Sequence, residues 1–295
     1  MNATEEKKTE KKEPERVTGS PVSTLTRKER EQVREGVRHR PAVVYEIIRL
    51  QGEAELRRPA SALWWSGVAA GISIGLSFLT EAALAAHLPP SVWTATIAKL
   101  GYAVGFLIVI LGHQQLFTEN VLTAVLPVMA RRKLEWVWRM LRLWGIVLTA
   151  NIAGCLIFAL AFAKLPLVGA DVSAELGRIV THLMQNTPFE MFTKGIGAGW
   201  IIAALVWLLA SSEGAEFPMI TLLTYLIALF GFTHVVAGSA EALYGVLTGM
   251  VTLTDAALGF FVLTLAGNVF GGTVLFSVLS YAQVREEIFE QKSNA

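Results

Sequence analysis

His234 lies within a long apolar segment and is the residue of this chain best suited to proton chemistry. An imidazole can accept and return a proton near neutral pH, and removal from water favours its neutral form. Thr118 lies at a similar break in another apolar segment and offers a hydroxyl as a hydrogen-bond partner. A buried histidine bonded to a freed carbonyl is the structural alternative, but the two interrupted segments favour a proton-exchanging site.

Both residues lie where apolar sequence is interrupted. The segment at residues 111–130 is broken at residues 116–120, and the segment at residues 218–250 is broken at residues 231–234 and loosened again at 238–241. Irregular backbone inside a bilayer persists only where protein encloses it or where it lines a cavity. Paired interrupted helices therefore indicate a transport site near the bilayer midplane.

Apolar residues make up 53% of the 295-residue chain and are concentrated between residues 62 and 282, which argues against a soluble multidomain protein. A helix needs about 20 mostly apolar residues to cross a bilayer. The expected fold is therefore an all-α membrane protein with six transmembrane helices. The predicted spans are residues 62–86, 98–130 (broken), 141–164, 190–210, 218–251 (broken) and 256–282.

The ends of the chain are charged, unlike this apolar middle. Residues 1–26 have little to bury and contain no apolar stretch of the kind found in a signal peptide. Within residues 27–56, Val44 and Ile48 recur at helical spacing, which predicts an amphipathic helix on the inner membrane surface or beneath the pore. The expected domains are a charged cytoplasmic tail (residues 1–58), a six-helix pore domain (59–285) and a second cytoplasmic tail (286–295).

Lysine and arginine residues are concentrated on one side of the predicted spans. The turn after the second span contains Arg131, Arg132 and Lys133, whereas the loops at residues 89–96 and 248–255 contain neither residue type. The positive-inside rule therefore places both termini in the cytoplasm. The acidic turn at residues 211–217, predicted to lie inside, departs from this pattern.

Three short motifs recur in the same order in the two halves of the pore region. Because each half contains three spans, an odd number, the second copy must enter the membrane inverted. This pattern predicts a 3+3 inverted repeat. The matching motifs are Asn151 with Asn268, Phe117-Thr118 with Phe232-Thr233, and residues 71–75 with residues 195–199.

Several polar side chains are expected to hold the broken backbones. Asn120 or Thr118 is expected to cap the half-helix after the first break. Asn151 and Asn268 are expected to bond the broken segments from spans three and six, although ordinary helix–helix hydrogen bonding is an equal alternative. Half-helix N-termini carry partial positive charge, so they favour anions.

Other isolated polar residues have simpler explanations. Lys194 and Glu190 lie one turn apart at the outer start of span four, where they either extend to the interface or attract anions into an outer vestibule. Glu241 is expected near the outer end of span five, in reach of water. Cys155 is the sole cysteine and is expected to be a packing residue. The sequence has no recognisable metal-ligand, nucleotide-binding or nucleophile motif, so no cofactor or metal and no enzymatic activity are expected.

The motifs Leu116-Phe117-Thr118, Gly231-Phe232-Thr233-His234 and Gly267-Asn268-x-x-Gly271-Gly272 resemble those of the formate/nitrite transporter family. The similarity covers about residues 40–285. It implies an aquaporin-like fold, a lipid-embedded homopentamer of the bacterial inner membrane, and one pore per protomer. It also implies conduction of small weak-acid anions such as formate, nitrite, hydrosulfide or a short monocarboxylate, with no nucleic-acid partner.

By motif position, Thr118 and His234 resemble the central polar pair of the family. The resemblance places Tyr102 and Ile227 at an outer constriction, and Phe106 with Phe117 at an inner one. The expected pore residues are His234, Thr118, Phe117, Leu116, Tyr102, Phe106 and Ile227, supported by Asn120, Asn151, Asn268 and Thr233, with Lys194 as the vestibule candidate.

The chain departs from the family pattern at several positions. Gln115 and Glu119 flank the Leu-Phe-Thr motif, glycine replaces an expected asparagine at Gly199 and Gly238, and residues 181–186 contain no lysine. The leading hypothesis is a proton-coupled channel or transporter for a small weak-acid anion. The alternatives are an aquaporin-like pore for a small neutral solute and a non-conducting scaffold in which residues 1–58 bind a partner.

Overall fold

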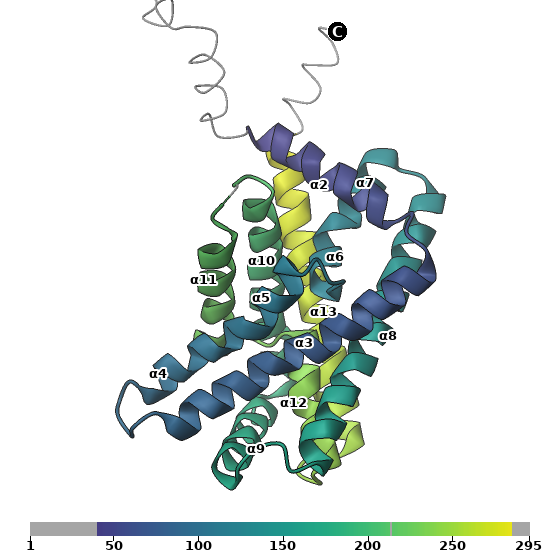
Figure 1. Cartoon of the computed structure of the whole chain (residues 1–295). Coiled ribbons are helices and arrows are strands. Elements are labelled where there is room, and N and C mark those ends of the chain that lie inside the picture. The colour runs from purple at the N-terminus through teal and green to yellow at the C-terminus, as the bar shows by residue number, and fades with distance from the viewer. Residues whose placement is uncertain (1–39, 213, 285–295) are drawn as a thin grey trace, which may run out of the picture. The chain divides into compact units, whose positions relative to one another are not determined.

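The structure is a computed structural model that describes residues 40–212 and 214–284 (Figure 1). Residues 1–39 of the predicted tail at 1–58, and all of the predicted tail at 286–295, lie outside these ranges. The described residues are helical, with no strand among them. In chain order the helices are α2 (Pro41–Glu55), α3 (Ala60–His87), α4 (Thr94–Ala98), η2 (Lys99–Tyr102), α5 (Ala103–Leu111), α6 (Phe117–Thr123), α7 (Val125–Arg131), α8 (Leu134–Lys164), α9 (Ala170–Met184), α10 (Pro188–Leu209), α11 (Glu216–Leu229), α12 (Val235–Leu247), η3 (Asp255–Phe261), α13 (Val262–Val269) and η4 (Phe270–Ser277).

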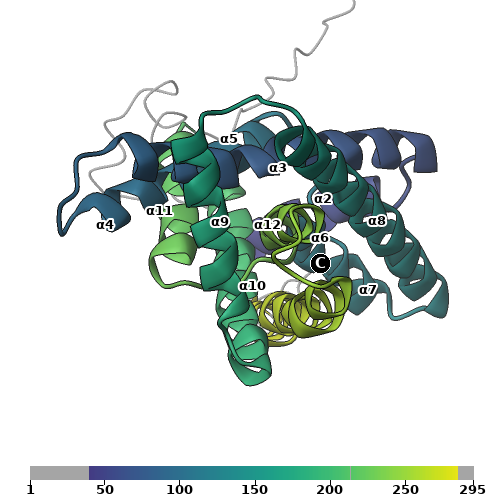
Figure 2. The same ribbon diagram turned by 90° about the horizontal axis from the view of Figure 1, so that it is seen from below.

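Five helical stretches of the described chain are long and apolar enough to cross a membrane. They are α3, the stretch from α4 to α5, α8, α10 and the stretch from η3 to Val284. The apolar helices α11 and α12 are shorter, because the second break separates them. Figure 2 shows α6 and α12 near the centre of the helices, with α3, α8, α9 and α10 around them.

The two breaks lie close to their predicted positions, but their bounds differ. The first covers residues 112–116, earlier than predicted, and α6 begins at Phe117. The second covers residues 230–234, one residue more than predicted. The predicted loosening at residues 238–241 is wrong, because α12 is continuous there. Gly238 instead permits close packing, since a Cβ at this position would lie 2.5 Å from the Phe260 ring.

The helix α9 fills much of the predicted loop between spans three and four. Val172, Leu176 and Val180 recur at four-residue spacing and are buried, and α9 packs against α3 and α12. At 15 residues this helix is too short to cross a bilayer on its own, so it is not among the predicted spans. It lies at the end of the molecule opposite α2 and α7 (Figure 1).

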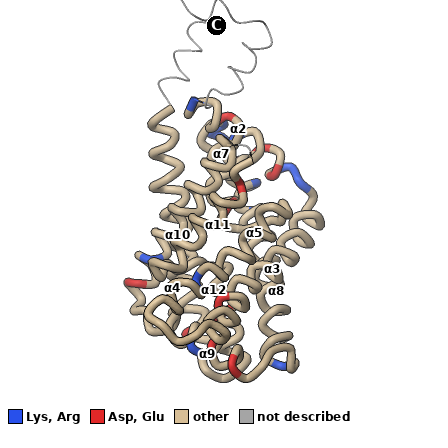
Figure 3. The backbone as a smooth tube through the Cα atoms, turned by 60° about the vertical axis from the view of Figure 1, so that its left-hand side comes forward, with Lys and Arg blue, Asp and Glu red and all other residues tan. Residues whose placement is uncertain are grey.

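The helix α2 packs on α6 and α7. Val44 and Ile48 are buried, whereas Leu50 is 53% exposed, so the apolar face is narrower than the sequence predicts. Glu53, expected on the polar face, is buried and accepts two hydrogen bonds from the Arg131 guanidinium, at 2.9 and 3.1 Å. Figure 3 shows these charged segments grouped at the α2 and α7 end.

Glycines allow close approach at two matching helix crossings. In the first, Gly71 of α3 lies against Gly154 of α8, and a Cβ on Gly154 would lie 2.2 Å from the Val68 carbonyl oxygen. In the second, between η4 and α10, a Cβ on Gly271 would lie 2.2 Å from the Ile196 carbonyl oxygen. Small residues at such crossings let helix backbones touch within a membrane.

We expect Gly154→Ala to lower the thermal stability of the detergent-solubilised protein by about 1–3 kcal/mol, since the added methyl group forces α3 and α8 apart. Gly145→Ala on the same helix is the matched control, because nothing lies within 4 Å of a Cβ at that position. Alanine also favours helix more than glycine does, so this control should be neutral or slightly stabilising. Equal melting temperatures for the two variants would contradict the close crossing.

Candidate functional site

The half-helices α6 and α12 both begin directly after a break. The residues that precede them, Leu116 and His234, have nearly the same extended backbone, with φ −102° and ψ 127° for Leu116 and φ −110° and ψ 124° for His234. The N-terminus of a helix leaves backbone N–H groups without intrahelical acceptors. Each of these two N-termini is buried, so it needs acceptors from elsewhere in the protein.

Asn151 of α8 supplies the acceptor for the first half-helix. Its Oδ1 accepts a hydrogen bond from Phe117 N at 2.9 Å, and its Nδ2 donates to the carbonyl oxygens of Gly67 and Gln115, both at 2.8 Å. The cap is therefore not Asn120 or Thr118, as local sequence rules predict. Asn120 instead donates to the side chain of Gln115 at 3.1 Å and braces the break itself.

Asn268 of α13 makes the corresponding set of contacts in the second half. Its Oδ1 accepts from Val235 N at 2.8 Å, and its Nδ2 donates to the carbonyl oxygens of Gly195 at 2.8 Å and Thr233 at 2.9 Å. Each asparagine thus joins a broken segment to the small-residue face of a neighbouring long helix. Thr233 also donates through its hydroxyl to the Met191 carbonyl at 2.9 Å.

These contacts define which positions of the two halves correspond. Gln115 corresponds to Thr233 and Phe117 to Val235, so the predicted match of Phe117-Thr118 with Phe232-Thr233 is wrong by three residues. The glycine that meets Asn151 is Gly67, one turn before the predicted motif at residues 71–75. Short motifs rich in glycine are similar in several registers, whereas a hydrogen-bond set fits only one.

The structure brings His234 and Thr118 together, with 2.7 Å between His234 Nε2 and Thr118 Oγ1. Both residues are buried. His234 Nδ1 accepts a hydrogen bond from Ala237 N at 3.2 Å, and because a backbone N–H can only donate, Nδ1 carries no proton. In the neutral ring the proton therefore sits on Nε2 and is donated to Thr118. The threonine hydroxyl hydrogen remains available for an acceptor in the pathway.

Aromatic rings extend from His234 on one side. The Phe106 ring meets the His234 ring edge-to-face with centroids 5.1 Å apart, and the Tyr102 ring lies 5.3 Å from Phe106. Ile227 is also buried, on α11, which packs against η2 and α5. These residues form an apolar wall beside the histidine.

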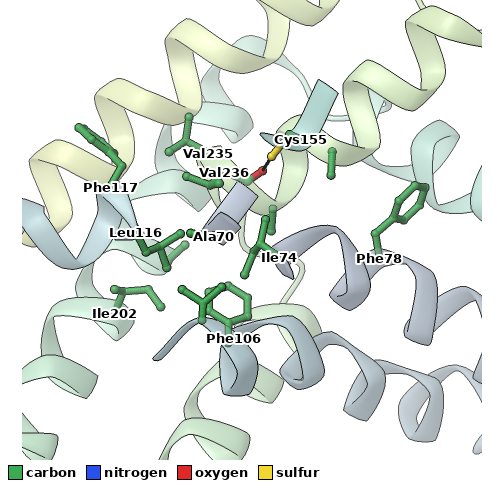
Figure 4. Packing of buried hydrophobic residues seen from close by; sticks show 14 of the residues in the cluster. Ala70, Ile74, Phe78, Phe106, Leu116, Phe117, Cys155, Ile202, Val235 and Val236 are labelled. Atoms are coloured by element: carbon green, nitrogen blue, oxygen red, sulfur yellow. Dashed lines mark hydrogen bonds between the residues drawn. The ribbon is translucent and has the colours of Figure 1, made fainter. Parts of the chain in front are cut away.

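Phe117 does not join this wall. Its ring packs edge-to-face against Trp144 of α8, at a centroid distance of 5.7 Å, and Figure 4 shows it directed away from Phe106. The predicted inner pairing of Phe106 with Phe117 is therefore not formed. Leu116 lies between them in that view. Successive residues at the start of a helix point in different directions, so a Leu-Phe pair cannot place both side chains on the same wall.

A cavity of about 820 Å³ extends from His234 and Tyr102 to the ends of α3, α4 and α9. Lys99 and Glu81 line it, although neither was among the expected site residues. Glu81 is a lone acidic residue inside an apolar span, and this feature could have identified it as a site residue from the sequence. Lys194 does not line the cavity; it donates to Asn186, which does.

Glu190 has a structural role rather than a place in the vestibule. Its carboxylate accepts hydrogen bonds from the backbone and hydroxyl of Thr187, both at 2.8 Å, and forms a capping box at the start of α10. Glu241, expected in reach of water, is buried on α12 and lines the cavity. The acidic residues of this region are therefore arranged differently from the sequence prediction.

Comparison with known proteins gives a consistent result. The sequence profile described as "Formate/nitrite transporter" matches residues 42–282. The chain is 42% identical over 253 residues to inner membrane protein YfdC of Escherichia coli (strain K12), a match covering 86% of this chain and 82% of that protein. It is 24% identical over 246 residues to formate channel BtFdhC of Bacillus thuringiensis, covering 79% of this chain and 91% of that protein.

Solved structures share the fold. One is an ion channel of the FNT family, with a TM-score of 0.67, 19% identity and coverage of 82% of this chain and 96% of the other. Another is a pentameric formate channel with formate bound, with a TM-score of 0.63, 20% identity and coverage of 77% and 97%. The predicted all-α membrane fold and the family resemblance are thus confirmed. The chain is an integral membrane protein that belongs to the formate/nitrite transporter family, whose members are channels and transporters rather than enzymes.

Proposed function

We propose that this protein conducts a small monovalent weak-acid anion together with a proton across the bacterial inner membrane, with formate as the first candidate. Nitrite, hydrosulfide and short monocarboxylates belong to the same class. The observation that carries the proposal is the buried hydrogen bond between Thr118 and His234, which joins the starts of two half-helices beside a cavity. The names of the formate channels among its relatives and structural neighbours add support.

The energetics favour passage of the neutral acid. Protonating a carboxylate of pKa about 4 at pH 7 costs roughly 4 kcal/mol, at 1.36 kcal/mol per unit. Moving the bare charge into an apolar constriction has an idealised cost of order 20 kcal/mol, and several kcal/mol remain after relaxation. The rings of Tyr102 and Phe106 carry no charge that would offset this cost, so protonation before the constriction is the easier route.

We also propose that the pore is built as a 3+3 inverted repeat with six spans. The support is the matched hydrogen bonding of Asn151 and Asn268 and the matched glycine crossings at Gly154 and Gly271. In this arrangement the N-termini of α6 and α12 enter from opposite sides and meet near the midplane. Their partial positive charge then lowers the electrostatic barrier to an approaching anion.

A pentamer is the expected assembly, on the basis of the pentameric formate channel among the structural neighbours. Exposed large apolar side chains such as Trp65, Trp138 and Leu134 offer area for contact with lipid or with other protomers. Mass measurement of the detergent-solubilised protein should give about five copies. A stable monomer that still conducts would contradict this expectation.

The lysine and arginine distribution leads us to propose cytoplasmic termini. A cysteine introduced at Ser91 or Ser173 should react with an impermeant thiol reagent added outside intact cells. One introduced at Ser293, which lies outside the described residues, should react only after the membrane is opened. The native Cys155 is fully buried and gives a low background. Labelling of Ser293→Cys in intact cells would reverse the topology.

Flux through proteoliposomes tests the function directly. The panel should contain formate, nitrite, acetate, lactate, hydrosulfide, glycerol and water, each measured at two external pH values with an internal pH dye. Uptake of formate that rises as the pH falls, with acid entering alongside, is the expected result. Flux of glycerol or water that ignores pH would favour a neutral-solute pore. Absence of any flux, with or without residues 1–40, would favour a scaffold.

A further inference from the structure

The cavity outside His234 is lined by more acidic than basic side chains, which is unexpected at the entrance to an anion pathway. Four carboxylates and two cationic groups line it, a formal excess of two negative charges. An entering anion is therefore repelled unless part of this charge is neutralised. The carboxylates belong to Glu81, Asp171, Glu175 and Glu241, and the cationic groups to Lys99 and Arg178.

Two of the four carboxylates have ordinary surface roles. Glu175 is paired with Arg178 on the same helix, with 3.1 Å between the charged atoms. The Asp171 side chain is 58% exposed and lies 3.9 Å from His87 at the rim. Both are in reach of water, so their charges are screened.

Glu241 is in a different position. It lies two turns after His234 on α12, is only 8% exposed and lines the cavity. Among the described residues its carboxyl group has no hydrogen-bond or ion-pair partner. A buried carboxyl group without a partner is expensive to keep charged, and one that faces a cavity can meet a ligand.

Glu81 of α3 lines the same cavity and is an electrostatic neighbour of Glu241. Lys99 is the nearby cation on the Glu81 side. Tyr102 is an electrostatic neighbour of both carboxyl groups, is 6% exposed, and has a hydroxyl without a partner among the described residues. Its ring contacts Phe106, which contacts His234, so the two carboxyl groups lie directly outside the apolar wall. Figure 3 shows acidic and basic segments beside α12, away from both charged ends.

We propose that Glu81 and Glu241 form a proton-donating pair that converts the entering anion to its neutral acid before it reaches Tyr102 and Phe106. Two carboxylates and one ammonium group leave a net negative charge that repels an entering anion in the buried part of the cavity, and a proton shared by the carboxylates removes that charge. In the transfer, the O–H bond of one glutamic acid breaks as an O–H bond forms on the substrate carboxylate. The glutamate then regains a proton from outside water.

This inference rests on the proposed function, because it identifies the proton donor for the same pathway. The elements packed against α12 carry other titratable or charged groups that bear on its pH dependence. Lys164 donates to the Leu247 carbonyl at 2.8 Å and Asp255 accepts from Thr252 at 2.7 Å, both beyond the end of α12. Glu119 of α6 is an electrostatic neighbour of Glu55 and does not line the cavity. The groups that line it are Glu81, Lys99, Tyr102, Asp171, Glu175, Arg178, His182 and His234.

The test compares uptake of labelled formate into proteoliposomes at external pH 7 and pH 4.5. The double variant Glu81→Gln/Glu241→Gln should lose at least about 10-fold of the uptake at pH 7. At pH 4.5 it should stay within about twofold of the unchanged protein, because about a quarter of a carboxylate of pKa about 4 is then already protonated in solution, against about 0.1% at pH 7. Glu241→Asp keeps a carboxyl group and should retain most of the uptake at pH 7. Asp171→Asn removes the same charge from the rim and should change neither value.

Three results would overturn the proposal. If the carboxylates only repel anions, the double variant would take up formate faster at both pH values. A loss of equal size at both pH values would mean that the residues are needed for structure, and not for proton donation. The proposed function fails separately, if the unchanged protein takes up no formate at either pH. If the unchanged protein conducts formate and the double variant conducts it equally well, the proposed function stands. Only the proton-donating role of Glu81 and Glu241 is then rejected.

Discussion

Replacing His234 with phenylalanine is expected to reduce carboxylate flux by about 100-fold or more while the oligomer remains assembled. Phenylalanine has a similar volume, so contact with the Phe106 ring is kept. The variant loses the hydrogen bond to Thr118 Oγ1 and the acceptor for Ala237 N. A group positioned to exchange protons contributes about 10²–10⁴-fold to rate in other proteins. Formate uptake in proteoliposomes and gel filtration of the purified protein measure the two parts of the prediction.

Matched variants separate the chemistry of His234 from its packing. Thr118→Val keeps the shape of the threonine and removes one partner, a loss of about 1–3 kcal/mol, so flux should fall about 10-fold. His182→Gln removes another histidine that lines the cavity, but an exposed one, and should leave flux unchanged. Unaltered and pH-insensitive flux in His234→Phe would contradict the mechanism and favour a pore for a neutral solute.

The sequence was sufficient to predict the class of fold and the two interrupted segments. Both are local features of the sequence: apolar stretches predict the spans, and polar residues or glycines within them predict the breaks. The pairing of Thr118 with His234 was expected because each lies in one of the two breaks and because the family motifs pair them, and Thr118 Oγ1 lies 2.7 Å from His234 Nε2. The two residues are 116 positions apart in the chain. Their pairing was predicted from the family motifs, because composition alone does not relate residues so far apart.

The bounds of the first break were predicted less well, because local rules place the cap of a helix within a few residues of its start. Here the acceptor for Phe117 N comes from Asn151, 34 residues further along. The register of the two halves was missed for the same reason. Several glycine-containing motifs fit equally well until the hydrogen bonds of the two asparagines select one alignment.

The grouping of charged residues in the cavity could not be predicted from the sequence. Glu81, Lys99 and Glu241 come from three elements, and no spacing rule relates them. Their meeting depends on the packing of α3, η2 and α12, and on the way α9 covers them. A buried ionisable residue in an apolar span indicates function, but only the folded arrangement identifies its neighbours.

Asn268→Asp is expected to prevent stable assembly, although aspartate and asparagine have nearly the same shape. Asn268 is fully buried, and its Nδ2 donates to two carbonyl oxygens at 2.8 and 2.9 Å. A carboxylate oxygen in the place of Nδ2 has no hydrogen to donate and would face both carbonyl oxygens. A neutral aspartic acid would supply one donor instead of two. Each lost or reversed hydrogen bond costs about 1–3 kcal/mol, and a buried charge costs more. The total is comparable with the whole stability of a typical domain.

The comparison with two other asparagines makes this prediction specific. Asn151→Asp should lower the yield of assembled protein and its melting temperature to the same extent, since Asn151 makes the equivalent three contacts. Asn186→Asp should be tolerated, because it loses one donated hydrogen bond, from Nδ2 to the Leu183 carbonyl, while the carboxylate gains an ion pair with Lys194. If Asn268→Asp assembles with an unchanged melting temperature, the half-helix is not held by this side chain. If only one of Asn151→Asp and Asn268→Asp fails to assemble, the two asparagines do not contribute equally to stability. The inverted repeat then describes the geometry of the two halves alone.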